Sequence, residues 1–247
     1  MKKELLLTLV FLGGCGGALH KKKQRAMNHY RQASLEIRNY QSENNTSSLH
    51  KALNEIDKAL EEHATAQSRG LKGTLLLQLG IINQNAQFIK DSLPYFEAIM
   101  KDRYAPKARK ADAQNNYATA LYQIGKNVEA LTIWNSLTTN PHYISPEVAF
   151  FNLGYAELNN ALRTAYQMPE QSKTEIDKYL EQAATCFRQA LAISHEYIDA
   201  LFFLARAQTS LNQLEDARNS ILTILTINPQ HELAKEWLKR IEQHIKQ

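Results

Sequence analysis

The residues that could carry out chemistry are scattered along this 247-residue chain. The stretch HELAK at 231–235 begins like a zinc-protease motif but lacks the second His one turn further on. GLKGT at 70–74 lacks the long glycine-rich loop that cradles a phosphate. The chain has no CxxC or GxSxG motif, and its eight His residues are dispersed. We therefore predict that the protein is not an enzyme, with no catalytic residue, no metal, no cofactor and no small-molecule substrate.

One side chain, Cys15, is predicted to be covalently modified. It follows a short basic start and an apolar run from Leu5 to Leu12, which is shorter than the ~20 residues that span a bilayer. This is the pattern of a secretory signal. The sequence LGGC at 12–15 resembles the bacterial lipobox. The resemblance implies cleavage before Cys15 and attachment of acyl chains such as palmitate to its thiol.

The lipobox resemblance sets the predicted domain organisation. Residues 1–14 are a signal peptide, residues 15–27 are the lipidated Cys and a basic tether, and residues 28–247 are the folded domain. Several acyl chains would give stable membrane anchoring. Gly16, in place of an Asp, favours sorting to the outer membrane of a bacterial cell envelope, on its periplasmic face. The alternative is a free thiol in an uncleaved signal, which Glu4 and the basic residues after the apolar run favour.

The net charge of +4 comes from residues that precede the predicted folded domain. Without the signal and the four basic residues at 21–25, the chain keeps 23 basic and 24 acidic residues, a net charge of −1. Nucleic-acid binders concentrate basic residues on one face. We therefore predict no nucleic-acid partner. The basic tether is either a contact for anionic headgroups or a solvated spacer.

The rest of the chain predicts an all-α fold. Ala, Leu, Gln, Glu and Lys dominate, and all are good helix formers. Four of the nine Gly residues lie in the first 17 residues. No window alternates apolar and polar residues over the length of a strand.

Small and large residues recur with the spacing of packed helix pairs. The segments that align are SLPYFEAI (92–99), ALTIWNSL (130–137), ATCFRQAL (184–191) and ARNSILTIL (217–225). The pattern resembles the tetratricopeptide repeat, which is about 34 residues long. Small residues let the two helices approach closely, for example Gly80 with Ser92 and Gly154 with Ala183, while Phe96 and Phe187 fill the space beside them.

Stacking these pairs predicts an α-solenoid of about five helix pairs. The last repeat is the fullest copy, and the fourth contains an insertion at about 159–179. Residues 231–247 form an amphipathic segment that we interpret as the C-terminal capping helix.

The repeat register predicts a partner-binding groove. In tetratricopeptide repeats the first helix of each pair lines the concave face. The positions predicted there are Leu77, Ile81, Asn115, Thr119, Tyr122, Val148, Phe151, Tyr155, Leu158, Phe202 and Arg206. Such an apolar, aromatic groove suits an amphipathic helix or an extended peptide. The alternative is that Phe151 and Tyr155 only pack against the insertion.

A closer resemblance lies in the middle of the chain. NNYATALYQIGKNVEAL (115–131), followed by FFNLG (150–154), resembles the type IV pilus biogenesis lipoproteins of the PilF/PilW/Tgl kind. The resemblance implies a pilotin-like role with secretin subunits as the protein partner. The alternative is a tetratricopeptide adaptor lipoprotein for peptidoglycan enzymes or another envelope assembly.

Overall fold

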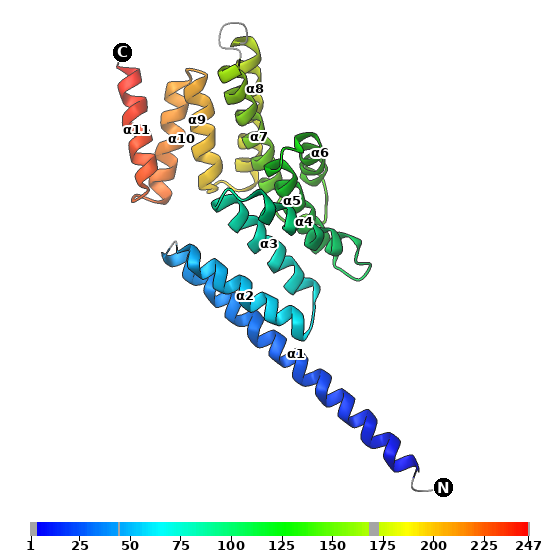
Figure 1. The fold of residues 1–247 in the computed structure, drawn as a ribbon. Helices are drawn as coiled ribbons and strands as arrows, with labels where there is room; N and C mark the ends of the chain where they lie inside the picture. Colours follow the sequence, from blue (N-terminus) through cyan, green and yellow to red (C-terminus); the bar gives the residue numbers. More distant parts are fainter. Residues whose placement is uncertain (1–3, 44, 168–172, 247) are drawn as a thin grey trace. The chain divides into compact units, whose positions relative to one another are not determined.

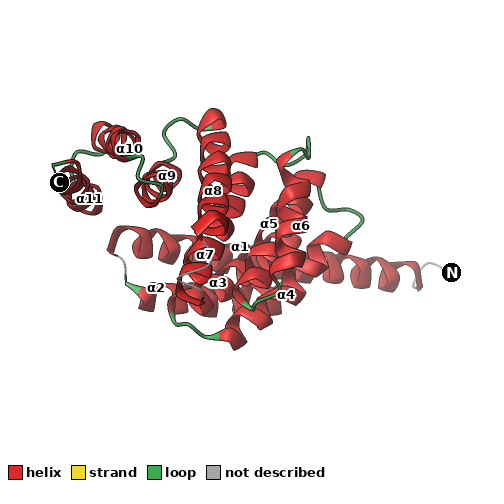
Figure 2. Ribbon diagram, turned by 90° about the horizontal axis from the view of Figure 1, so that it is seen from above, coloured by secondary structure: helices red, strands yellow, loops and turns green. Residues whose placement is uncertain are grey.

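The computed structural model describes residues 4–43, 45–167 and 173–246, with side chains from residue 17 onward. Within these ranges the chain forms eleven α-helices and no strand (Figure 2). The helices are α1 (Glu4–Glu43), α2 (Thr46–Glu62), α3 (Ala66–Ile82), α4 (Ala86–Lys101), α5 (Lys107–Gln123), α6 (Asn127–Thr138), α7 (Pro146–Gln167), α8 (Lys173–Ile193), α9 (Ile198–Ser210), α10 (Leu214–Ile227) and α11 (Glu232–Ile245). The predicted all-α class is confirmed.

The chain divides into two compact units, Met1–Lys126 and Asn127–Gln247, here called unit 1 and unit 2. In unit 1, α1 packs with α2 and α3 with α4, while α5 packs on α4 (Figure 1). In unit 2, α7 packs with α8 and α9 with α10, and α11 covers α10. Each unit is therefore a stack of helical hairpins in which successive helices complete one another's apolar stripe.

The first helix, α1, runs through the segment predicted as a basic tether. Ala26 and Ala33 are buried, and Arg25 forms an ion pair with Glu62 of α2 with an Nε–Oε1 distance of 2.7 Å. Packing against α2 thus starts within the predicted tether. The side chains of residues 1–16, Cys15 included, lie outside the described residues. Across the part of the chain that the structure describes, no helix combines the length and apolar character that crossing a bilayer requires.

Three helices, α3, α5 and α9, end in the same turn. The residue in the left-handed conformation is Gln84 (φ 52°), Gly125 (φ 85°) or Asn212 (φ 61°). The next amide donates to the carbonyl oxygen five residues earlier, with N–O distances of 2.8, 2.9 and 2.8 Å. This is the hydrogen bond of the Schellman motif. The turn therefore recurs with the repeats.

Small residues bring paired helices together as predicted. A Cβ atom added to Gly80 of α3 would lie 2.5 Å from Cγ1 of Ile89 in α4. A Cβ atom added to Gly154 of α7 would lie 2.8 Å from Cε1 of Phe187 and 3.1 Å from the carbonyl oxygen of Ala183, both in α8. Ordinary van der Waals contact requires more space than this, so both crossings depend on glycine.

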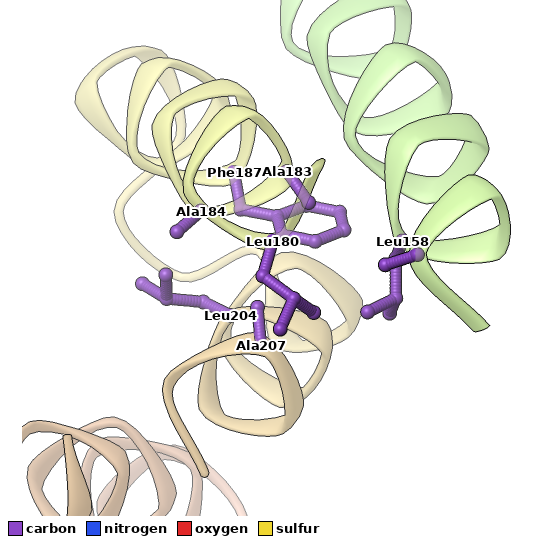
Figure 3. Packing of buried hydrophobic residues seen from close by; sticks show 8 residues of the cluster. Leu158, Leu180, Ala183, Ala184, Phe187, Leu204 and Ala207 are labelled. Atoms are coloured by element: carbon purple, nitrogen blue, oxygen red, sulfur yellow. The ribbon is translucent and has the colours of Figure 1, made fainter. Parts of the chain in front are cut away.

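The predicted insertion at about 159–179 includes the end of α7 and the start of α8, the longer pair of helices in unit 2. Helices α7 and α8 have 22 and 21 residues, against 13 and 14 in α9 and α10. Leu158 of α7, Leu180 of α8 and Leu204 of α9 meet in one buried cluster together with Phe187 (Figure 3). Residues 168–172 of the predicted insertion lie outside the described residues.

Candidate protein-binding surface

Phe151 of α7 lies at the centre of an aromatic cluster in unit 2. Its ring centroid is 5.8 Å from that of Phe187, 5.2 Å from that of Tyr197 and 5.7 Å from that of Phe203. Tyr155, one turn further along α7, meets Phe203 edge to face at 5.3 Å and 86°. Edge-to-face pairs at such distances add to the stabilisation that burial alone provides. The cluster therefore holds its rings in fixed orientations.

The cluster continues onto α9 and α11. The ring of Phe202 in α9 is edge to face with Phe203 at 5.9 Å and with Trp237 of α11 at 5.8 Å. We call the whole set the aromatic array. Its members are Phe151, Tyr155, Phe187, Tyr197, Phe202, Phe203 and Trp237. Phe187 is fully buried, and the other members are half-buried and present part of their surface.

Two arginines stack on the aromatic array. The guanidinium carbon of Arg206 lies 5.2 Å from the ring centroid of Phe203, and that of Arg240 lies 5.9 Å from the ring centroid of Trp237. Both distances are within the range of cation–π attraction. Burial raises the pKa of Tyr197 to about 12, with further contributions from Asp199 and Glu147. The phenol of Tyr197 is therefore neutral at physiological pH.

Most residues predicted for the groove in unit 2 lie on this surface. Phe151, Tyr155, Phe202 and Arg206 belong to the array or stack on it, and Val148 is half-buried on α7. The ring partners of Phe151 and Tyr155 lie outside the predicted insertion at 159–179.

Leu158 is a correction to the predicted groove. Its exposed fraction is 2%, because the long α7 places it against α8 and α9 in the core (Figure 3). It is a core residue and is unavailable to a partner.

Three half-buried members of the aromatic array, Tyr197, Phe203 and Trp237, were missing from the prediction, as was Arg240. A signal was present in the sequence, because Phe203 precedes Arg206 by three residues and Trp237 precedes Arg240 by three residues. Residues three apart on a helix are neighbours on its surface. The repeated aromatic–arginine spacing would have indicated Phe203 and Trp237.

In unit 1 the predicted groove residues lie in a different environment. Leu77 is a correction, since its exposed fraction is 5% and it packs against Ile89 and Phe96 in the core. Ile81 is exposed, whereas Asn115, Thr119 and Tyr122 are half-buried. The hydroxyl of Thr119 donates to the backbone carbonyl of Asn115 at 3.0 Å.

Unit 1 also has a small cavity of about 250 Å³ beside α1, α3 and α5. Gln67 donates to the hydroxyl of Tyr30 at 3.2 Å on its wall, and Asn116 donates to the hydroxyl of Thr74 at 3.4 Å. Burial raises the pKa of the Asp112 carboxyl, which the charge of Arg109 opposes. The wall therefore combines hydrogen-bonded polar side chains with apolar ones such as Leu71 and Ile99.

A larger cavity of about 660 Å³ lies between α6, α7 and α8 of unit 2. Its wall includes Cys186, whose pKa is raised to about 11 by burial and by Glu157. The thiol stays protonated at neutral pH and is a weak nucleophile. Among the residues that the structure describes, no group of three His, Cys, Asp or Glu side chains is placed to hold a metal ion.

Comparison with known proteins agrees with the repeat architecture. The tetratricopeptide-repeat family model matches residues 178–241, which comprise most of α8, the repeat predicted as the fullest copy, and most of α11. No curated protein matches the sequence significantly. The fold is that of a tetratricopeptide-repeat α-solenoid, a class of generally non-catalytic scaffolds that bind proteins.

Two of the solved structures that this chain resembles align over most of its length. PilF of Pseudomonas aeruginosa aligns with a TM-score of 0.56 and 16% identity, covering 91% of this chain and 87% of the PilF chain. A thermophilic tetratricopeptide protein of Thermus thermophilus aligns with a TM-score of 0.56 and 16% identity, covering 88% of this chain and 99% of the other. At this identity the similarity establishes the fold.

Proposed function

We propose that the protein is a lipid-anchored, non-catalytic scaffold that binds a protein partner on the aromatic array and assists assembly of a type IV pilus secretin. The observation that carries the proposal is the array itself. Partly exposed aromatic rings and arginines, held in place by their neighbours, are the residue types that dominate binding energy at protein interfaces. Tetratricopeptide repeats provide the scaffold for such a surface.

The choice of a secretin rests on the sequence. NNYATALYQIGKNVEAL (115–131) and FFNLG (150–154) resemble the PilF/PilW/Tgl lipoproteins, and LGGC at 12–15 supports the lipid anchor. In this proposal the anchor holds the scaffold at the periplasmic face of the outer membrane, where secretin subunits assemble.

The first experiment deletes the gene and measures secretin multimers on denaturing gels. We expect secretin to remain monomeric in the deletion strain and multimers to return with the wild-type gene. Tyr155→Ala should restore them poorly, because it removes a ring from the array. Val128→Ala, at a residue of α6 with 79% exposure outside the array, is the matched control and should restore them fully. Undiminished multimers in the deletion strain would contradict the secretin role. The adaptor alternative would be favoured if Tyr155→Ala abolished binding of a peptidoglycan enzyme and left the secretin multimers unchanged.

The lipid anchor is tested separately with labelled palmitate. Incorporation should be lost in Cys15→Ala. Label retained by that variant would refute acylation at Cys15.

A further inference from the structure

The two arginine–aromatic stacks of unit 2 are one feature repeated. Arg240 follows Arg206 by 34 residues, the length of one tetratricopeptide repeat. Each arginine is the ninth residue of its helix, and each stacks on the aromatic residue three positions earlier. Phe202 contacts both Phe203 and Trp237, so the two stacks belong to one connected platform.

Neither guanidinium of these stacks forms an ion pair with an acidic side chain in the described part of the chain. Other arginines do, since Arg25 pairs with Glu62, and Arg218 of α10 pairs with Glu242 of α11 at 3.7 Å. Each guanidinium lies over an aromatic ring, and its N–H donors form a fork that matches a carboxylate. Arg206 and Arg240 are therefore oriented by the rings and have donors left for a ligand.

Both arginines lie toward the C-terminal ends of their helices. On α9, Asp199 is the second residue and Arg206 the ninth. On α11, Glu232 is paired with Lys235 at 2.9 Å, and Glu242, which follows Arg240, is paired with Arg218 at 3.7 Å. The arginine end is thus the part of the surface complementary to negative charge.

We propose, building on the proposed function, that the partner segment is an acidic amphipathic peptide. Its apolar side chains lie on the aromatic array, and its carboxylates accept hydrogen bonds from Arg206 and Arg240. Because each arginine is the ninth residue of its helix, the acidic part of the segment lies toward the C-terminal ends of α9 and α11.

The test uses two synthetic peptides with the same leucine stripe, one with Glu on its polar flanks and the other with Gln at every one of those positions. Binding to the full chain is measured by fluorescence anisotropy. We expect the Glu peptide to bind roughly tenfold more tightly, because hydrogen bonds to charged partners are stronger than those to neutral ones. The difference should shrink as ionic strength rises.

Variants assign the preference to the two arginines. Arg206→Gln and Arg240→Gln should each weaken binding of the Glu peptide several-fold, and the double variant should bind both peptides equally. Arg218→Gln is the matched control, since this arginine has its own partner in Glu242. Unchanged helical circular dichroism shows that the variants fold.

Equal binding of the two peptides to the wild-type chain would overturn the inference, as would a preference that survives in the double variant. Neither result would contradict the proposed function if Tyr155→Ala still reduces the amount of secretin multimers. Loss of that effect with an intact Glu preference would instead contradict the secretin role alone.

Discussion

The helix faces of unit 1 and unit 2 differ, although their cores are built by the same device. In both units a glycine of one helix lies against a buried phenylalanine of the next, Gly73 against Phe96 and Gly154 against Phe187. Outside the core, unit 1 has a small cavity whose wall carries hydrogen bonds between polar side chains, such as that of Gln67 to Tyr30. Unit 1 also has cation–π contacts, of Lys72 with Tyr95 and of Arg103 with Tyr104, whereas in unit 2 the arginines lie on a connected array of aromatic rings. The repeat thus constrains the packing positions and leaves the surface positions free to specify a partner.

The largest effects should come from removing the two core phenylalanines. Phe96 is 1% exposed and Phe187 is 0% exposed. Phe96→Ala and Phe187→Ala should each reduce the free energy of unfolding by about 3–5 kcal/mol, through lost burial and the cavity that remains. Urea unfolding followed by circular dichroism measures both. Both tryptophans, Trp134 and Trp237, lie in unit 2, so tryptophan fluorescence follows that unit separately. A cost below about 1 kcal/mol in either unit would show that its core is not built as described.

Adding a methyl group at the paired glycines should have the next largest effect. A Cβ atom at Gly73 would lie 2.9 Å from Cε1 of Phe96, and one at Gly154 would lie 2.8 Å from Cε1 of Phe187. Gly73→Ala and Gly154→Ala should each destabilise the protein by about 1–3 kcal/mol through overpacking. Gly17→Ala is the control, because a Cβ atom there meets nothing within 4 Å. Equal stability of Gly154→Ala and Gly17→Ala would argue against the close crossing of α7 and α8.

The smallest expected effect is the pH-dependent contribution of Glu55, in unit 1, to the free energy of unfolding. Glu55 of α2 accepts from Lys58 at 2.6 Å and lies 2.7 Å from Nδ1 of His29 in α1. The bonds from Lys58 and then His29 hold the pKa of Glu55 below its ordinary value. Because the folded pKa is the lower one, the stabilisation is present above the unfolded value of about 4.3 and is lost as pH falls through the folded pKa.

Glu55→Gln should therefore destabilise the chain at neutral pH by about 0.5 kcal/mol, the size of a partly exposed ion pair. The difference from wild type should shrink as the pH falls into the acid range. It is measured by urea unfolding at a series of pH values. A difference that grows on acidification would contradict the assigned role of Glu55.

The fold was more predictable from the sequence than the surface. Gly80, Gly154, Phe96 and Phe187 indicate helix crossings because close packing permits few residue types there. Leu77 and Leu158 were assigned to the groove from repeat register alone, and the structure buries both. The repeat register predicts on which side of its helix a residue lies. Its burial depends in addition on the lengths and positions of the neighbouring helices, such as the long α7 and α8 around Leu158.

The segment before the first repeat illustrates another limit. Its basic composition predicts a tether, yet Arg25 and Ala26 already pack on α2. The partner of Arg25 is Glu62, 37 residues away, and no local pattern indicates such a contact.

The central claim is that a protein partner binds on the aromatic array of unit 2. The most direct measurement places a photo-crosslinking amino acid at Tyr155, or at Val128 as the control, in the full chain in cells. We predict that position 155 crosslinks to secretin subunits and that position 128 does not. Crosslinking from position 128 with none from position 155 would contradict the account.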